Sequence, residues 1–372
     1  MTAKRCRWGI LGTAGIARKN WQAIRLAGNA QVTAVASRDV LAAQRFIDEC
    51  SAEVPQIAGP TAVGSYEELL AREDVDAVYI PLPTAMRHMW VMRAAQAGKH
   101  IIGEKPAAAS AAQVAEMLDA CRQHNVQYMD GVMFMHSQRL PLLRELLSGD
   151  EPLGQLRRLS AQFSFAGDED FRRSNIRTHS ELEPYGCLGD LGWYCVRFFL
   201  WVKQGQLPVE VRGRMLSTLQ GQDSPASVPG EFSGELLFAD GVSASFYCSF
   251  VTENQQWAHV SGSRGYFRVD DFVLPFHGSE VAAISGQDRF SVENCTFHME
   301  PHVTRHVVRE YDAAHATAQE TRMFRHFSEL VLSDRREPQW PEWTLKTQQV
   351  LDACYQSACQ EGEPVYLSPA EA

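Results

Sequence analysis

Short apolar runs alternate with amphipathic segments along the first third of the chain. The first run, residues 8–11, leads into a glycine-containing turn and then into a helical pattern over residues 18–27. Further runs at strand length are found at residues 32–37, 76–80, 99–102 and 126–129. Helical patterns separate them, at residues 66–72, 88–97 and 111–124. Because strands that alternate with helices pair side by side in parallel, this region predicts an α/β domain with a parallel sheet.

The pattern changes after Arg139. Residues 156–165 alternate between apolar and polar positions, and the runs 231–238 and 242–250 flank the hairpin signal Ala239-Asp240-Gly241. Further strands are predicted at residues 257–261 and 266–269, a short helix at 140–147, and a last long helix that Gly362 ends. Short turns without crossover helices predict an antiparallel sheet. Residues 278–296 indicate only irregular structure or short strands.

Length and composition narrow the class of protein. The chain has 372 residues, enough for two domains, which we place at residues 1–130 and 131–372. The net charge of −10 argues against a nucleic-acid partner. The nine cysteines are scattered without a Cys-x-x-Cys pair, which argues against a zinc ribbon or a disulfide framework. Met1–Arg7 has no apolar leader, and no apolar run approaches the ~20 residues of a membrane span, so we expect a cytoplasmic protein without membrane contact.

The turn after the first strand has the context of a dinucleotide-binding fingerprint, which requires a strand, a glycine turn and a helix in that order. Gly12 suits the tight turn, and the following helix start offers free N–H groups to a pyrophosphate. Ala14 stands where the strict pattern has glycine, and Ala17 supplies the small third residue. The candidate loop comprises Gly12, Thr13, Ala14, Gly15, Ile16 and Ala17. Taken alone, the motif is weak, because glycine turns between strands and helices are common.

The end of the next strand favours NADP over NAD. An NAD site usually has an acidic residue here, which bonds the ribose 2′-hydroxyl. This chain has Ser37-Arg38, and a hydroxyl with a guanidinium suits a 2′-phosphate. Two alternatives stay open. Asp39 would serve NAD if the turn aimed it at the ribose, and Arg38 would be an ordinary solvated residue if the enzyme does not discriminate.

Glu104-Lys105-Pro106 follows the strand at residues 99–102 and precedes a helical segment. Ligands of open α/β sheets bind at the carboxyl ends of the strands, where Lys105 is expected. A lysine there can hold and activate a hydroxyl or carbonyl oxygen, while Pro106 restricts Lys105 to extended conformations. The alternative is a surface lysine at a strand–helix turn.

Asp190 and Tyr194 are four residues apart, near the start of a predicted buried helix. At this spacing they would share one helix face, where they form a plausible acid/base group. The alternatives are a helix N-terminal carboxylate for Asp190 and a core aromatic for Tyr194. His298, His302 and His306 have helical spacing, but Pro301 interrupts the helix, so we expect no metal site.

Four stretches of the first 130 residues resemble, in order, the Gfo/Idh/MocA oxidoreductases. They are residues 9–17, 65–70, 75–84 and 98–106. Further on, Gly189-Asp190-Leu191-Gly192-Trp193-Tyr194 resembles the family's Asp-x-Gly-x-His/Tyr segment, and residues 364–367 also look familial. With tyrosine at position 194, the chain resembles the dihydrodiol-dehydrogenase and glucose–fructose branches, which have tyrosine there. The inositol-dehydrogenase branch has histidine at that position.

The resemblance implies an N-terminal Rossmann domain and a C-terminal α/β domain with a large, open, mostly antiparallel sheet. It implies dimerisation through that sheet, as a homodimer or a dimer of dimers, and a final helix, residues 344–361, that packs back on the first domain. The cofactor would lie across residues 12–17, with Lys105 holding the reacting oxygen and Asp190 an adjacent substrate hydroxyl. The predicted cofactor contacts after the second strand are Ser37, Arg38, Pro81, Leu82, Pro83, Thr84, His88, Glu104 and Lys105.

The function expected from the resemblance is hydride transfer between NADP, or NAD, and a hydroxyl or ketone of a sugar, polyol or dihydrodiol. Tyr194 would donate the proton in the reducing direction. Two other functions stay open: a glycosidase that acts by transient oxidation, and a non-enzymatic sensor of NADP redox state. The sensor would be expected to lose the lysine and the tyrosine, and this chain keeps both Lys105 and Tyr194.

Overall fold

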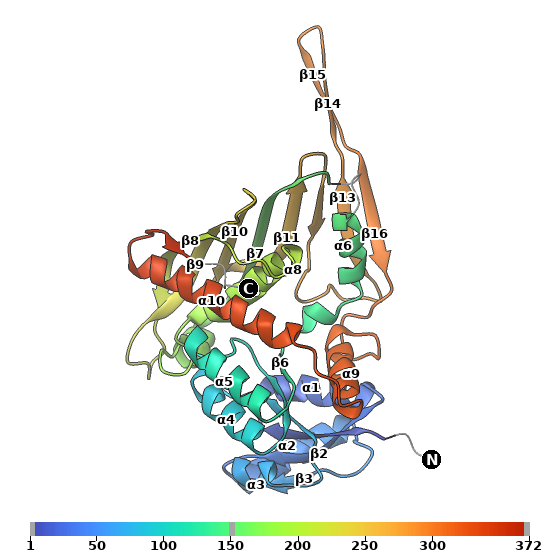
Figure 1. Cartoon of the computed structure of the whole chain (residues 1–372), viewed down its shortest axis with the longest axis vertical. Helices are drawn as coiled ribbons and strands as arrows, with labels where there is room; N and C mark the ends of the chain where they lie inside the picture. The colour runs from blue at the N-terminus through green and yellow to red at the C-terminus, as the bar shows by residue number, and fades with distance from the viewer. Residues whose placement is uncertain (1–3, 149–152, 368–372) are drawn as a thin grey trace. The chain divides into compact units, whose positions relative to one another are not determined.

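Six parallel strands form one sheet, in the order β3-β2-β1-β4-β5-β6 (Figure 1). The structure is a computed structural model that describes residues 4–148 and 153–367, so the leader prediction from Met1–Arg7 lies partly outside the described residues. The elements of this region are β1 (Cys6–Leu11), α1 (Gly15–Leu26), β2 (Ala30–Ala36), α2 (Val40–Glu53), β3 (Thr61–Val63), α3 (Tyr66–Leu70), β4 (Ala77–Ile80), α4 (Thr84–Gln96), β5 (His100–Gly103), α5 (Ala111–Gln123) and β6 (Tyr128–Asp130). The predicted parallel α/β sheet is confirmed.

Helix α4 starts earlier than the sequence indicates. The prediction of a start at His88 is wrong, because Thr84 is already helical and Pro83 occupies the position before it. A proline is compatible with a helix start, since the first N–H groups have no acceptor within the helix. The stretch after β4 therefore combines a rigid turn with a helix N-terminus, both at the carboxyl edge of the sheet.

A helix from late in the sequence covers the centre of this sheet. Phe324 of α9 (Gln319–Leu332) packs edge-on against Trp8 of β1, with ring centroids 5.1 Å apart, and against Tyr79 of β4 at 5.7 Å. Trp8 Nε1 also donates a hydrogen bond to Ser328 Oγ at 3.1 Å. Trp8 and Tyr79 are fully buried, so α9 is part of the core of the parallel sheet.

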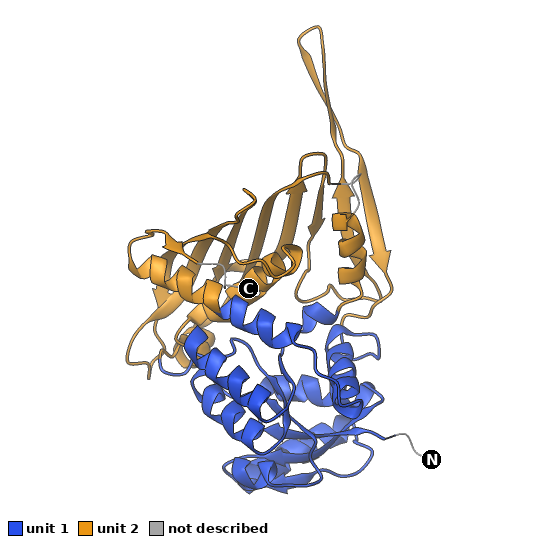
Figure 2. Cartoon of the chain, in the orientation of Figure 1, with its two compact units in different colours: residues 1–136, 181–183, 313–348 blue, residues 137–180, 184–312, 349–372 orange. Residues whose placement is uncertain are grey.

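The chain divides into two compact units that interleave in sequence (Figure 2). Unit 1 comprises residues 1–136, 181–183 and 313–348, and unit 2 comprises residues 137–180, 184–312 and 349–372. Unit 1 thus contains α9 and the beginning of α10 (Gln339–Cys359), which the sequence prediction assigned to the second domain. The domain boundary at residue 130 and the packing of the final helix on the first domain stay predictions.

Unit 2 is built on a nine-stranded sheet, in the order β16-β13-β12-β11-β7-β10-β9-β8-β17. Among its pairs only β7 and β10 run parallel, so the predicted large, mostly antiparallel sheet is confirmed. Its use in dimerisation stays a prediction. The elements are α6 (Arg139–Ser148), β7 (Leu156–Ala166), α7 (Glu169–Ser174), α8 (Trp193–Val202), β8 (Glu210–Leu219), β9 (Val228–Leu237), β10 (Ser243–Ser249), β11 (Val251–Gly262), β12 (Tyr266–Val269), β13 (Val281–Gly286), β16 (Val303–Val308) and β17 (Val365–Tyr366).

Between β13 and β16 the chain forms a projecting two-stranded hairpin, β14 (Arg289–Glu293) and β15 (Thr296–Glu300) (Figure 1). The sequence indicated only irregular structure or short strands here. Cross-strand pairing places Phe290 opposite Met299 and Val292 opposite Phe297, so one face of the hairpin is apolar. These four side chains are 52–72% exposed.

No helix within residues 4–148 and 153–367 is long and apolar enough to cross a membrane.

His100, the first residue of β5, predicts that the stability of the protein depends on pH. Burial and, to a smaller extent, the nearby Arg336 charge together lower the pKa of His100 to about 4. The His100 Nδ1 accepts a hydrogen bond from the Gln127 N–H at 3.0 Å. An unfolded histidine titrates near 6.5. Between pH ~6.5 and ~4 the unfolded chain therefore binds a proton that the folded chain does not, and the free energy of unfolding falls as the pH falls, by at most about 1.4 kcal/mol per pH unit.

We expect His100→Asn, which keeps an acceptor but cannot titrate, to lose this part of the pH dependence. Urea unfolding of both proteins between pH 7.5 and pH 4.5, about the window that the two pKa values define, is the measurement. Parallel pH profiles of wild type and variant would contradict the prediction.

Candidate active site

The turn after β1 has the geometry that a dinucleotide loop requires. Gly12 adopts φ +104°, a backbone conformation that residues with a side chain rarely adopt. Its N–H donates a hydrogen bond to the Ala36 carbonyl at the end of β2, at 2.8 Å. A Cβ at Gly12 would lie 3.1 Å from Leu82 Cδ2, so Leu82 closes one side of this turn. The predicted residues Gly12 and Leu82, from the loops after β1 and β4, are therefore neighbours.

The start of α1 is open to an anion. Ala14 precedes the helix and offers no side-chain cap, and the first turn carries no acidic residue. A Cβ placed on Gly15 would meet no atom within 4 Å, whereas Ala17 is fully buried, as the close packing of helix on strand requires. The first N–H groups of a helix have no acceptor within the helix and carry its positive dipole end. A phosphate would satisfy both at this position.

The structure distinguishes Arg38 from its neighbour Asp39. Asp39 caps α2, where its Oδ1 accepts the Leu41 N–H at 2.9 Å, and its Oδ2 lies 3.6 Å from Arg45. Arg38 is exposed, and among the described residues no hydrogen bond or ion pair engages its guanidinium. Ser37, also predicted, precedes it and donates its N–H to the Val63 carbonyl at 3.1 Å. The carboxylate is therefore in use as a helix cap, and the guanidinium is available to a ligand.

Tyr66 connects Arg38 with the glycine turn. Burial raises the pKa of Tyr66, and the positive charge of Arg38 opposes that rise, which places the guanidinium near the phenol. The Tyr66 hydroxyl in turn lies 3.7 Å from the position that a Cβ on Gly12 would take. Arg38 and the turn after β1 thus belong to one cluster at the carboxyl edge of the sheet.

A carboxylate from a distant segment caps α4. Glu183, only 8% exposed, accepts the Thr84 N–H at 3.0 Å through Oε1 and the Thr84 hydroxyl through Oε2. The carbonyl of Leu182 accepts the next N–H, that of Ala85, at 3.2 Å. Residues 181–183 belong to unit 1, so these contacts lie within one unit. They hold the loop of Pro81, Leu82, Pro83 and Thr84, which was predicted to contact the cofactor.

Arg87 connects this loop with the one that carries Lys105. Its Nη1 donates to Thr84 Oγ1 at 2.8 Å and also to the Pro106 carbonyl, and its Nη2 lies 3.8 Å from Glu183 Oε1. Arg87 is 5% exposed. Its buried charge therefore faces one carboxylate and two oxygens of the site loops.

The Glu104-Lys105-Pro106 segment follows β5 directly, as predicted. Lys105 is half-buried, and the Lys105–Pro106 peptide bond is cis. Glu104 accepts a hydrogen bond from the Tyr79 hydroxyl at 2.6 Å, and that hydroxyl accepts one from Asn20 Nδ2 at 2.6 Å. Burial, together with the Glu104 carboxylate, raises the pKa of Tyr79, so the phenol stays protonated as a donor.

His88 lies one turn into α4, and its ring hydrogen-bonds Glu116 of α5 at 2.8 Å. Because the Glu116 side chain is 63% exposed, this pair lies at the outer surface of the two helices. Its assignment as a cofactor contact stays a prediction.

Asp190 and Tyr194 belong to unit 2. Asp190 lies in a π-helical turn, Leu188–Gly192, and α8 starts at Trp193, so the two residues do not lie in a single α-helix. That they share one helix face stays a prediction. Asp190 pairs with Arg177 at 2.8 Å, and the buried Tyr194 ring packs edge-on against Phe163 at 5.6 Å. The catalytic roles of Lys105, Asp190 and Tyr194 stay predictions.

The three histidines with helical spacing are not on a helix. His298 lies in β15 and His306 in β16, on different strands, with His302 between them. Within residues 4–148 and 153–367, no three His, Cys, Asp or Glu side chains are grouped closely enough to hold a metal ion.

The sequence analysis did not identify Arg87, Tyr79 or the cap that Glu183 provides for α4. Arg87 could have been found, since it lies three residues after Thr84 and so on the same face of α4. Tyr79 was hidden within an apolar strand. No local signal identifies Glu183 as the cap, because it lies 99 residues from Thr84.

Two family models match the chain. One, described as an oxidoreductase family with an NAD-binding Rossmann fold, matches residues 6–132. The other, the C-terminal domain of the GFO/IDH/MocA proteins, matches residues 142–268.

Named relatives include a dTDP-3,4-didehydro-2,6-dideoxy-α-D-glucose 3-reductase of Streptomyces violaceoruber, 31% identical over 76% of this chain and 84% of the relative. The trans-1,2-dihydrobenzene-1,2-diol dehydrogenase of Sus scrofa is 31% identical over 71% of this chain and 74% of the relative. Among solved structures, the 3-ketoreductase KijD10 from Actinomadura kijaniata, in complex with NADP and TDP-benzene, superposes with a TM-score of 0.79 at 25% identity, covering 95% of this chain and 98% of that one.

The contrast between Gly12 and Gly15 predicts opposite effects of the same substitution on stability. Gly12→Ala puts a side chain at positive φ and against Leu82, so we expect it to lower the free energy of unfolding by about 1–3 kcal/mol. Gly15→Ala meets open space at a helix start and should change stability by less than about 0.5 kcal/mol. Denaturant unfolding of the two variants is the measurement, and equal losses would contradict the assigned geometry.

Proposed function

The chain belongs to the Gfo/Idh/MocA oxidoreductase family, and from this premise we propose that it transfers hydride between NADP and a hydroxyl or ketone carbon of a sugar-like substrate. It is an NAD(P)-dependent oxidoreductase by membership of that family. The bound cofactor supplies the hydride acceptor or donor. The observation that carries the proposal is the cluster in unit 1: an uncapped α1 N-terminus, open space at Gly15, and the available guanidinium of Arg38.

The residues of unit 1 fit an NADP molecule. The turn from Gly12 to Gly15 leaves room for a pyrophosphate at the start of α1. The negative charge of the pyrophosphate would complement the positive end of the helix dipole. Arg38 would bind the 2′-phosphate, since Asp39 is engaged at the start of α2. Residues 81–84 and Glu104 would line the nicotinamide end. Relatives support this choice: NADP is bound in the KijD10 structure named above.

For the substrate we propose a sugar or cyclic diol, because one relative reduces a keto sugar and another oxidises a dihydrodiol, according to their names. Lys105, as an ammonium, holds the reacting oxygen and stabilises the negative charge that develops on it. Tyr194 donates the proton to this oxygen during reduction and takes it back during oxidation. Asp190 accepts a hydrogen bond from an adjacent substrate hydroxyl, and Arg177, 2.8 Å away, orients that carboxylate.

Cofactor preference tests the Arg38 assignment. We expect fluorescence titration to give at least a 10-fold lower Kd for NADPH than for NADH, because one charge-assisted phosphate contact contributes about 1.5–3 kcal/mol. Arg38→Ala should abolish the preference by weakening NADPH alone. Asp39→Asn is the matched control, since it changes the neighbouring charge but keeps an oxygen to cap α2. A preference that survives in Arg38→Ala would contradict the assignment.

Catalytic roles are tested by Lys105→Ala and Tyr194→Phe, with NADPH consumption measured on a panel of keto sugars and with NADP reduction measured on aldoses and cyclic diols. We expect Tyr194→Phe to lower kcat by about 10²–10⁴-fold, which is the usual contribution of a positioned acid or base. Lys105→Ala should cost more, because it removes both charge and positioning. Tyr194→Phe should bind NADPH as wild type does. Full activity of either variant would refute the role proposed for that residue.

A further inference from the structure

Arg87 is a buried arginine, and its burial costs hydration free energy. A guanidinium removed from water loses several kcal/mol of hydration, and a hydrophobic residue of similar size would often serve stability equally well. Arg87 is 5% exposed, and its Nε has no hydrogen-bond partner among the described residues. Stability alone therefore does not account for this arginine.

The partners of Arg87 come from three separate segments of unit 1. Thr84 belongs to its own helix, Pro106 follows Lys105, and Glu183 comes from the segment at residues 181–183. Glu183 also caps α4 through both of its oxygens, so its carboxylate is fixed relative to Thr84. The guanidinium therefore fixes the Pro106 carbonyl relative to the start of α4.

The residues on both sides of Lys105, Glu104 and Pro106, are therefore held by hydrogen bonds. On one side, Glu104 is held by the Tyr79 hydroxyl at 2.6 Å, and Tyr79 is fully buried. On the other side, the Pro106 carbonyl is held by Arg87. With both adjacent residues held, the backbone of Lys105 is restrained, and so is the direction of its Cα–Cβ bond.

We propose that Arg87 and Glu183 are positioning residues for Lys105. Glu183 orients Arg87 and the start of α4, and Arg87 in turn holds the loop that presents the lysine. This inference rests on the proposed function, in which Lys105 holds the reacting oxygen. A displacement of about 1 Å in such a group can cost on the order of 10²-fold in rate, so the effect should appear in kcat.

The first test is a double-mutant cycle on kcat between Arg87→Gln and Lys105→Ala. If Arg87 acts through Lys105, Arg87→Gln should lower kcat about 10- to 100-fold in wild type and less than about 3-fold in the Lys105→Ala background. The Kd for NADPH should change by less than about 3-fold, since the phosphate cradle is on other loops. Equal effects of Arg87→Gln in both backgrounds would show that it acts independently of Lys105 and would overturn the inference.

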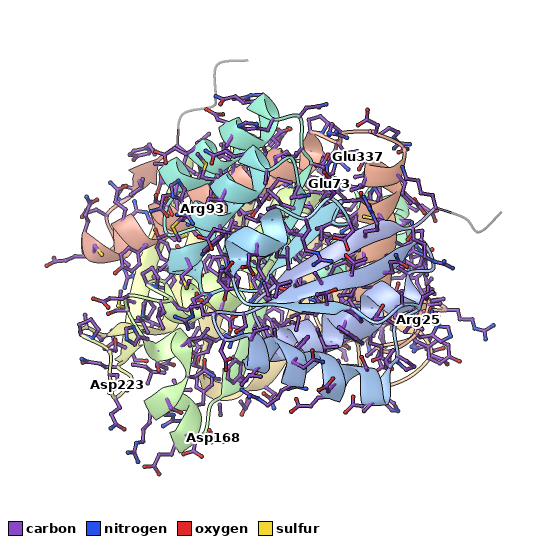
Figure 3. All side chains as sticks on the ribbon, turned by 90° about the horizontal axis from the view of Figure 1, so that it is seen from below. Arg25, Glu73, Arg93, Asp168, Asp223 and Glu337 are labelled. Carbon is purple, nitrogen blue, oxygen red and sulfur yellow. The ribbon has the colours of Figure 1, made fainter. Side chains whose placement is uncertain are left out.

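Conservative variants separate positioning from simple loss of fold. Arg87→Lys keeps the charge with fewer donors and should recover part of the lost kcat, while Glu183→Gln should lower kcat in the same way as Arg87→Gln. Arg93→Gln is the matched control on the same helix: Arg93 (labelled in Figure 3) is 44% exposed and pairs with Glu67 at the surface. We expect it to leave kcat unchanged, and an equal loss in Arg93→Gln would overturn the inference.

Hydrogen–deuterium exchange gives a readout that does not depend on activity. Arg87→Gln should increase deuterium uptake in the peptide that covers residues 104–110 and leave the peptide of α1 unchanged. Unchanged uptake at residues 104–110 would overturn the inference. Should Arg87→Gln fail to fold, Glu183→Gln decides through the same cycle and the same peptide. Failure of the proposed function has a different signature: full activity in Lys105→Ala, whatever the outcome at Arg87.

Discussion

Parallel strand pairing is the constraint on which the candidate site depends. The register pairs Leu11 with Ala36 and Ile80 with Gly103, so β1, β2, β4 and β5 end at one edge of the sheet. Loops that are far apart in the sequence must therefore leave the sheet together. The glycine turn, Arg38, the start of α4 and Lys105 are all consequences of that alignment, because each is the first feature after the end of a strand.

Polar groups buried beside these loops convert the alignment into fixed geometry. A strand end determines only where a loop starts, and the direction of the loop depends on the hydrogen bonds that hold it. In this chain those bonds come from side chains in the core and in neighbouring loops: Tyr79 on Glu104, Arg87 on Pro106, and Glu183 on Thr84. Each of these buried groups finds hydrogen-bond partners in the site loops. The loops are held in place by these bonds, and the buried groups would lack partners without the loops.

The sequence was informative where the signal is local. Strand, glycine turn and helix are adjacent in the chain, so Gly12 and its loop could be predicted, and Lys105 at the end of β5 followed from the same rhythm. Contacts between distant segments left no such local signal: Glu183 caps α4, and Phe324 packs on Trp8 and Tyr79. The π turn at Asp190 was not predicted for a different reason: its five residues, Leu188–Gly192, are too few for their apolar spacing to distinguish a π turn from an α-helical turn.

The late position of α9 has a consequence for how the protein is made. The ribosome synthesises the six parallel strands long before residues 319–332 of α9. Trp8 and Tyr79 therefore lack the helix that covers them during most of synthesis. During that interval the nascent sheet exposes aromatic surface of the kind that chaperones bind. Unit 1 therefore cannot complete its core in the order in which it is translated, and any fragment that stops before α9 retains that exposed surface permanently.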